Sequence, residues 1–72
     1  MKITSWNVNS LNVRHPQVLQ YLNNYAPDIL GLQELKQTDE AVNSQAFIDA
    51  GYHIATYGQK TYNGVASLVA TP

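Results

Sequence analysis

Residues 28–34 read DILGLQE, and this stretch decides the fold of the chain. Its apolar part, Ile29 to Leu32, shows no alternation between apolar and polar side chains. Such a short, continuous apolar run is typical of a strand that is buried on both faces, as in parallel sheets. We therefore expect a central strand here, with the polar residues Gln33 and Glu34 at its end.

A second strand is predicted at residues 2–8, because apolar and polar side chains alternate there between two faces. Its last polar residue, Asn7, comes just before the turn signal Asn9-Ser10. Trp6 lies inside this strand, and we expect it to pack in the core rather than to serve as a stacking platform.

One helix is predicted between these two strands. Pro16 suits the first turn of a helix, where its missing N–H is not needed. The helix should end before Pro27, because the residue before a proline is pushed out of the α region. The apolar side chains that recur at helical spacing are Val18, Leu19, Leu22, Tyr25 and Ala26.

Strand, helix and strand over about 30 residues form a βαβ unit, whose crossover is almost always right-handed. The two strands are then parallel, so their carboxyl ends lie at the same edge of the sheet. Ligands of open α/β sheets bind outside these ends. Asn7 and Glu34 both occupy them, so we expect the two side chains to lie close together.

The second half of the chain predicts a polar loop, a short helix and two more strands. Asn43 or Ser44 could cap a helix that continues to Ala50, with Gly51 just after its end. Residues 53–57 and 65–69 read as strands, and residues 58–64 read as a hairpin loop. The predicted helices cover one face of this sheet, so we expect the isolated chain to fold weakly or to self-associate.

Length and composition restrict the chain to one small domain. It has 72 residues, of which 44% are apolar, and a formal net charge of −1. It has no cysteine, which excludes disulfides and thiolate metal sites. No apolar stretch approaches the ~20 residues of a membrane span, and we expect a cytoplasmic protein. By charge alone, ordinary surface explains the basic residues better than a nucleic-acid site does; they are Lys2, Arg14, Lys36 and Lys60.

The pair Asn7 and Glu34 can form part of a site for a hard cation. Mg²⁺ prefers oxygen ligands and keeps several waters, so one carboxylate and one amide oxygen are an acceptable protein share. Asn7 can instead orient Glu34, or a phosphate, through a hydrogen bond. The alternatives are a surface carboxylate at Glu34 and an ordinary turn residue at Asn7.

Three ordered motifs resemble the opening of the exonuclease III family of abasic-site endonucleases, within the endonuclease/exonuclease/phosphatase superfamily. They are WNVNSL at residues 6–11, PDILGLQELK at 27–36 and GQKTYNGVA at 58–66. The resemblance implies that residues 1–72 are the N-terminal part of one domain, a four-layer α/β/β/α sandwich. It also implies Mg²⁺-dependent hydrolysis of DNA phosphodiesters, with Mn²⁺ as a possible substitute.

The resemblance assigns roles to individual residues. Glu34 is the expected metal ligand, and Asn7 is a catalytic residue beside the metal and the scissile phosphate as well as a second candidate metal ligand. The expected DNA contacts are Asn9, Lys36, Lys60 and Tyr62. The alternatives are an exposed lysine at Lys36 and the tip of a hairpin for Lys60 and Tyr62. Two residues depart from the pattern of many members, Asn12 in place of arginine and Leu35 in place of threonine.

The implied partner is double-stranded DNA with abasic sites or 3′ ends, and the whole protein is expected to be a monomer without a membrane partner. The family's water-activating aspartate, catalytic tyrosine and Asp-His pair would lie beyond residue 72, and His15 and His53 are in the wrong motifs to replace that histidine. Two rival functions remain: a phosphoesterase acting on lipid headgroups, and a truncated fragment without catalytic activity.

Overall fold

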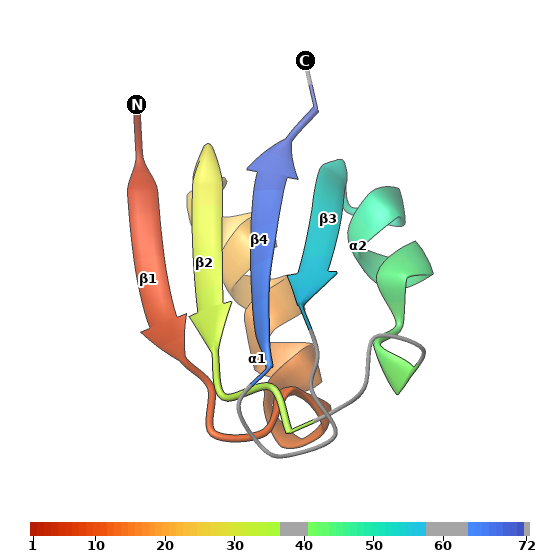
Figure 1. Cartoon of the computed structure of the whole chain (residues 1–72). Helices are drawn as coiled ribbons and strands as arrows, with labels where there is room; N and C mark the ends of the chain where they lie inside the picture. The colour runs from red at the N-terminus through yellow and green to blue at the C-terminus, as the bar shows by residue number, and fades with distance from the viewer. Residues whose placement is uncertain (37–40, 58–63, 72) are drawn as a thin grey trace.

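The computed structural model describes residues 1–36, 41–57 and 64–71, and within them four strands form one mixed sheet. The strands are β1 (Ile3–Asn7), β2 (Ile29–Gln33), β3 (Tyr52–Tyr57) and β4 (Val65–Ala70). Their order in the sheet is β1-β2-β4-β3 (Figure 1). β1 and β2 are parallel, and β4 is antiparallel to both of its neighbours. The predicted α/β class with a parallel βαβ unit is confirmed.

Helix α1 (Leu11–Tyr25) connects β1 to β2 and begins earlier than the sequence predicts. Pro16 lies inside the helix rather than in its first turn, so that part of the prediction is wrong. The early start has a tertiary cause, because the N–H of Leu11 donates to the carbonyl of Leu35 at 2.9 Å and the Leu11 side chain is fully buried. The helix ends before Pro27, as predicted, with Ala26 in the left-handed conformation.

Helix α2 (Ser44–Asp49) is short and packs against β3. Asn43 caps it, because its side-chain oxygen accepts a hydrogen bond from the backbone N–H of Ala46 at 3.3 Å. Gly51 follows the helix with a φ of +93°, a conformation that glycine adopts without strain. The predicted cap and the predicted end of this helix are both confirmed.

The core lies between one face of the sheet and the helices, and α1 passes behind the sheet in Figure 1. Leu30 and Leu32 of β2 are fully buried on this face. Trp6 is half-buried there and packs edge to face against Tyr21, with the two ring centroids 5.8 Å apart. The predicted packing of Trp6 in the core is thus confirmed. The other core side chains are Val8, Leu11, Val18, Leu22, Leu35, Val42, Phe47, Tyr52, Ala66 and Leu68.

The opposite face of the sheet, which we call the open face, is not covered by the described residues. Ile29 and Gly31 of β2 lie on it and are only half-buried, so the expected burial of this strand holds on one face alone. The strand pairing arranges the open face in three rows. From the termini toward the site, they are Ile3-Ile29-Val69-His53, Ser5-Gly31-Ser67-Ala55 and Asn7-Gln33-Val65-Tyr57.

Candidate active site at the ends of β1 and β2

The turn after β1 and the turn after β2 run side by side and are joined by backbone hydrogen bonds. The N–H of Val8 donates to the carbonyl of Gln33 at 3.1 Å, which continues the pairing of the strands. Beyond the sheet, the N–H of Ser10 donates to the carbonyl of Glu34 at 2.9 Å. A further bond, from the N–H of Leu35 to the carbonyl of Gly64 at 3.0 Å, ties the second turn to the residue before β4. These bonds hold the site residues at one edge of the sheet.

Four residues of these two turns have a positive φ, although none is glycine. The angles are 44° at Asn9, 95° at Ser10, 56° at Glu34 and 56° at Lys36. Asparagine adopts this region more readily than most residues, whereas serine, glutamate and lysine rarely do. Backbone strain of this kind persists only where surrounding contacts enforce it, and it is concentrated at functional sites. The backbone bonds between the turns supply that enforcement.

The side chains of the two turns form a closed set of hydrogen bonds. The backbone N–H of Asn9 donates to the side-chain oxygen of Asn7 at 3.1 Å. The Asn7 side-chain nitrogen donates in turn to the carboxylate oxygen Oε2 of Glu34. The ammonium group of Lys36 donates to the side-chain oxygen of Asn9 at 2.5 Å. Because Glu34 and Lys36 are two positions apart, the backbone between them closes the ring. Four residues that the sequence singles out are thus brought together.

The ring fixes the orientation of the Asn7 amide. Its oxygen accepts the hydrogen bond from the Asn9 N–H, so its nitrogen must face Glu34. In the described part of the chain, the second carboxylate oxygen of the half-buried Glu34 has no hydrogen-bond partner. This oxygen is the one that the geometry leaves for a cation.

The fit to a metal ion is therefore partial. A single carboxylate beside an amide suits Mg²⁺, which accepts one or two carboxylates and completes its shell with water and phosphate. Within residues 1–36, 41–57 and 64–71, no group of three His, Cys, Asp or Glu side chains gathers in a way that could hold a metal ion. The remaining ligands would have to come from elsewhere.

A second polar pair lies next to Asn7 on the open face. The side-chain nitrogen of Gln33 donates to the hydroxyl of Ser5 at 2.7 Å. Gln33 is the register partner of Asn7, so this bond lies one step from the ring. Neither Gln33 nor Ser5 is among the site residues predicted from the sequence. The alternation of residues 2–8 could have indicated Ser5, because it places Ser5 and Asn7 on one face.

The sequence predicts two further DNA contacts and does not favour either histidine as a site residue. Lys60 and Tyr62 lie outside the described residues.

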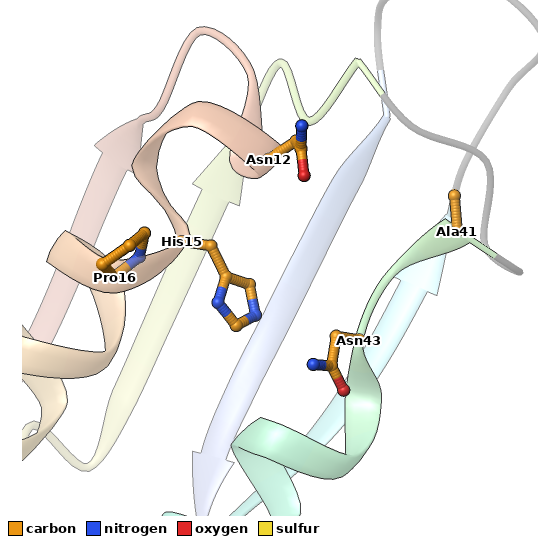
Figure 2. A pocket seen from close by; sticks show the side chains of 5 residues that line it. All are labelled: Asn12, His15, Pro16, Ala41 and Asn43. Carbon is orange, nitrogen blue, oxygen red and sulfur yellow. The ribbon is translucent and has the colours of Figure 1, made fainter.

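His15 packs its ring against Phe47 at a centroid distance of 5.1 Å, and His53 is exposed on β3. His15 also lines a cavity of about 260 Å³ between the two helices, which Figure 2 shows from close by. The cavity is lined by Asn12, His15, Pro16, Ala41 and Asn43.

Tyr52, the first residue of β3, lies at the end of the sheet away from the candidate site, and it is a buried tyrosine with a structural role. The hydroxyl of Tyr52 donates to the carbonyl of Pro27 at 2.7 Å. Burial raises the pKa of this hydroxyl above its ordinary value of 10.0, and the negative charge of Asp28 and the neighbouring Tyr21 raise it further.

In the part of the chain that the structure describes, no helix has both the length and the apolar character of a membrane span.

Comparison with known proteins gives matches both in sequence and in fold. The sequence pattern of the Endonuclease/Exonuclease/phosphatase family matches residues 4–72. Exodeoxyribonuclease III of Haemophilus influenzae is 43% identical over 68 residues, which are 94% of this chain and 26% of that protein.

Two solved structures are similar in fold as well. The 3′ phosphatase NExo from Neisseria, bound to a product DNA hairpin, is 55% identical with a TM-score of 0.92. An AP endonuclease from Archaeoglobus fulgidus is 38% identical with a TM-score of 0.91. Each alignment covers 96% of this chain and 27% of the other. The chain thus spans about a quarter of the length of these relatives.

Proposed function

Because the chain belongs to the endonuclease/exonuclease/phosphatase family, we propose that the protein of which it forms a part is a Mg²⁺-dependent DNA repair nuclease of exonuclease III type. Its reaction would be the hydrolysis of phosphodiesters at abasic sites and at 3′ ends. The observation that carries the proposal is the hydrogen-bonded ring of Asn7, Asn9, Glu34 and Lys36 at the carboxyl ends of two parallel strands. Similarity to exodeoxyribonuclease III and to a DNA-bound 3′ phosphatase supports DNA as the substrate.

Glu34 and Asn7 have separate roles in this proposal. Glu34 holds the ion through its carboxylate, and Asn7 lies beside it and the scissile phosphate. A bound Mg²⁺ supplies the positive charge that offsets negative charge building on phosphate oxygens. Of the two roles that the sequence allows for Asn7, metal ligand or orienting donor, the amide orientation supports the second.

The proposed DNA contacts surround this ring. Lys36 and Asn9 are exposed at the same edge of the sheet, where a cation and an amide can meet phosphate oxygens. Lys60 and Tyr62 remain predictions from the sequence alone. So do a cytoplasmic location, a monomeric state of the whole protein and activity with Mn²⁺.

The 72-residue chain by itself should not be an efficient enzyme. Glu34 is the only carboxylate within the ring, and its other members, Asn7, Asn9 and the Lys36 ammonium group, offer no carboxylate or imidazole as a second acid–base group. General acid–base catalysis typically contributes 10²–10⁴-fold, so its absence alone removes most of the rate.

The proposal is tested with whole protein and three substrates: a duplex with one abasic site, a duplex with a recessed 3′ end, and a phosphorylated lipid headgroup. We expect Mg²⁺-dependent cleavage of the two DNA substrates and none of the headgroup. Cleavage of the headgroup alone would support the lipid phosphoesterase and refute the proposal. Inactivity of the whole protein on every substrate would support a non-catalytic role.

A further inference from the structure

The ammonium group of Lys36 binds back across the site rather than only facing solvent. It donates to the side-chain oxygen of Asn9 at 2.5 Å and so joins the turn after β2 to the turn after β1. Asn9 has a φ of 44°, and in this conformation its N–H faces the side-chain oxygen of Asn7. The cation is thus linked to the Asn7 amide through one intermediate residue.

We propose that Lys36 and Asn9 are positioning residues that fix the Asn7 amide as a donor to Glu34. This inference rests on the proposed cation site and deepens it. With the Asn7 oxygen held by the Asn9 N–H, the Asn7 nitrogen binds one oxygen of Glu34. Glu34 then presents its second oxygen in one orientation. Lys36 therefore affects cation binding without contacting the cation.

The proposal makes a prediction that charge alone does not make. A lysine ammonium near a divalent cation repels it, so by Coulomb's law any neutral replacement of Lys36 should tighten cation binding. Loss of the link to Asn9 should instead weaken binding, because the Asn7 amide can then rotate. Groups that orient metal ligands typically change affinity by about 10- to 100-fold when removed.

A pair of variants with equal charge separates the two effects. Lys36→Gln removes the charge but keeps an N–H donor for Asn9, whereas Lys36→Met removes both. Binding of Mn²⁺ to the whole protein is followed by the paramagnetic broadening of the backbone amide signals of residues 7–11 and 33–36. We expect the Lys36→Gln protein to bind Mn²⁺ at least as tightly as the wild type, and the Lys36→Met protein to bind it roughly tenfold more weakly than the Lys36→Gln protein.

A second observable reports on Asn7 directly. In the wild type and in Lys36→Gln, the two side-chain amide protons of Asn7 should give separate, well-dispersed signals. In Lys36→Met they should approach the positions of a freely rotating asparagine. Asn9→Gly provides an independent test, because glycine tolerates the positive φ while it removes the acceptor of the Lys36 bond. Its charge equals that of the wild type, so it should bind Mn²⁺ more weakly than the wild type, and its Asn7 amide signals should move as they do in Lys36→Met.

The outcomes distinguish this inference from the proposed function. Equal Mn²⁺ affinity and equal Asn7 signals in Lys36→Met and Lys36→Gln would overturn the positioning role alone. Broadening that is absent in the wild type, or unchanged in Glu34→Gln, would refute the cation site itself. Far-UV circular dichroism of each variant shows whether its fold is retained. If a Lys36 variant loses its fold, Asn9→Gly is compared with the wild type, which has the same charge.

Discussion

The side-chain amide of Asn7 donates a hydrogen bond to the carboxylate of Glu34, across 27 positions of sequence. The bond is possible because β1 and β2 are parallel and in a register that pairs Asn7 with Gln33. Glu34 is the next residue, and its positive φ turns the chain directly after the strand. Topology brings the two residues to one edge, and an unusual backbone conformation completes the contact.

Replacement of Glu34 by glutamine should lower the activity of the whole protein sharply. Glutamine has nearly the same shape and can still accept a hydrogen bond from Asn7, but it lacks the charge that holds a cation. We expect kcat/KM on an abasic-site duplex to fall by at least about 100-fold and the Mg²⁺ dependence to weaken. Asp49→Asn in α2 is the matched control, because Asp49 is exposed and, among the described residues, its side chain is bonded only to Gln45. Unchanged kinetics in Glu34→Gln would exclude the assigned role.

Replacement of Ser10 by glycine should stabilise the fold. Ser10 has a φ of 95° and a ψ of 104°, and its side chain makes no capping hydrogen bond to α1. Glycine removes backbone strain of about 1–3 kcal/mol from the folded state. It also makes the unfolded chain more flexible, and this entropy offsets roughly 0.5–1 kcal/mol of the gain. We expect a net gain of about 1 kcal/mol in the free energy of unfolding, measured by chemical denaturation. Ser10→Ala retains the strain and should show no gain; equal stability of the two variants would contradict this account.

The hydroxyl of Tyr52 should make stability depend on pH in the alkaline range. Its pKa is raised in the folded state by burial and by Asp28. The folded protein therefore keeps this proton at a pH where the unfolded chain, with an ordinary pKa of about 10, releases it. The stabilisation is complete below pH 10 and is lost as the pH rises through the folded-state pKa.

Tyr52→Phe should remove this contribution to the alkaline loss of stability. It should also lower the free energy of unfolding at pH 7 by about 1 kcal/mol, through loss of the hydrogen bond to Pro27. The measurement is chemical denaturation at intervals from pH 7 to 11. Tyr57→Phe serves as the control, because Tyr57 is 67% exposed. Parallel pH curves for wild type and Tyr52→Phe would show that Tyr52 is not the responsible group.

The open face should cause the 72-residue chain to associate. Ile3 is 67% exposed and Val69 is 43% exposed, and both belong to the row that also contains Ile29. Ile3→Lys should shift the chain toward the monomer in sedimentation experiments, because burial of a lysine against a second apolar face is unfavourable. Val13→Lys, on α1, should have no such effect, although Val13 is 61% exposed. A wild-type monomer at all concentrations, with a cooperative thermal transition, would contradict the expectation.

Most of the fold follows from hydrophobic periodicity and from a few turn residues. The unbroken apolar run Ile29 to Leu32 and the alternation of residues 2–8 correctly predict the parallel pair, and Asn43 and Gly51 correctly delimit α2. These features are local, and each has a recognisable sequence signature. The convergence of Asn7 and Glu34 also follows from strand direction alone.

The detailed shape of the site could not be predicted in the same way. Nothing in the local sequence marks Glu34 and Lys36 for a positive φ, since neither residue type favours it. The conformation depends on bonds between the two turns, such as that from Ser10 to Glu34. The early start of α1 has the same origin, because the partner of Leu11 is Leu35. Contacts between distant segments decided these features against local preference.

The ring that joins Asn7, Asn9, Glu34 and Lys36 has a consequence for the order of assembly during synthesis. All four residues lie within residues 7–36, so every bond of the ring can form before β3 and β4 have left the ribosome. Domains begin to fold as their N-terminal segments emerge. The later bond from Leu35 to Gly64 would then add β4 to an existing template. The chemically important turns can thus act as a nucleus around which the remaining strands are placed.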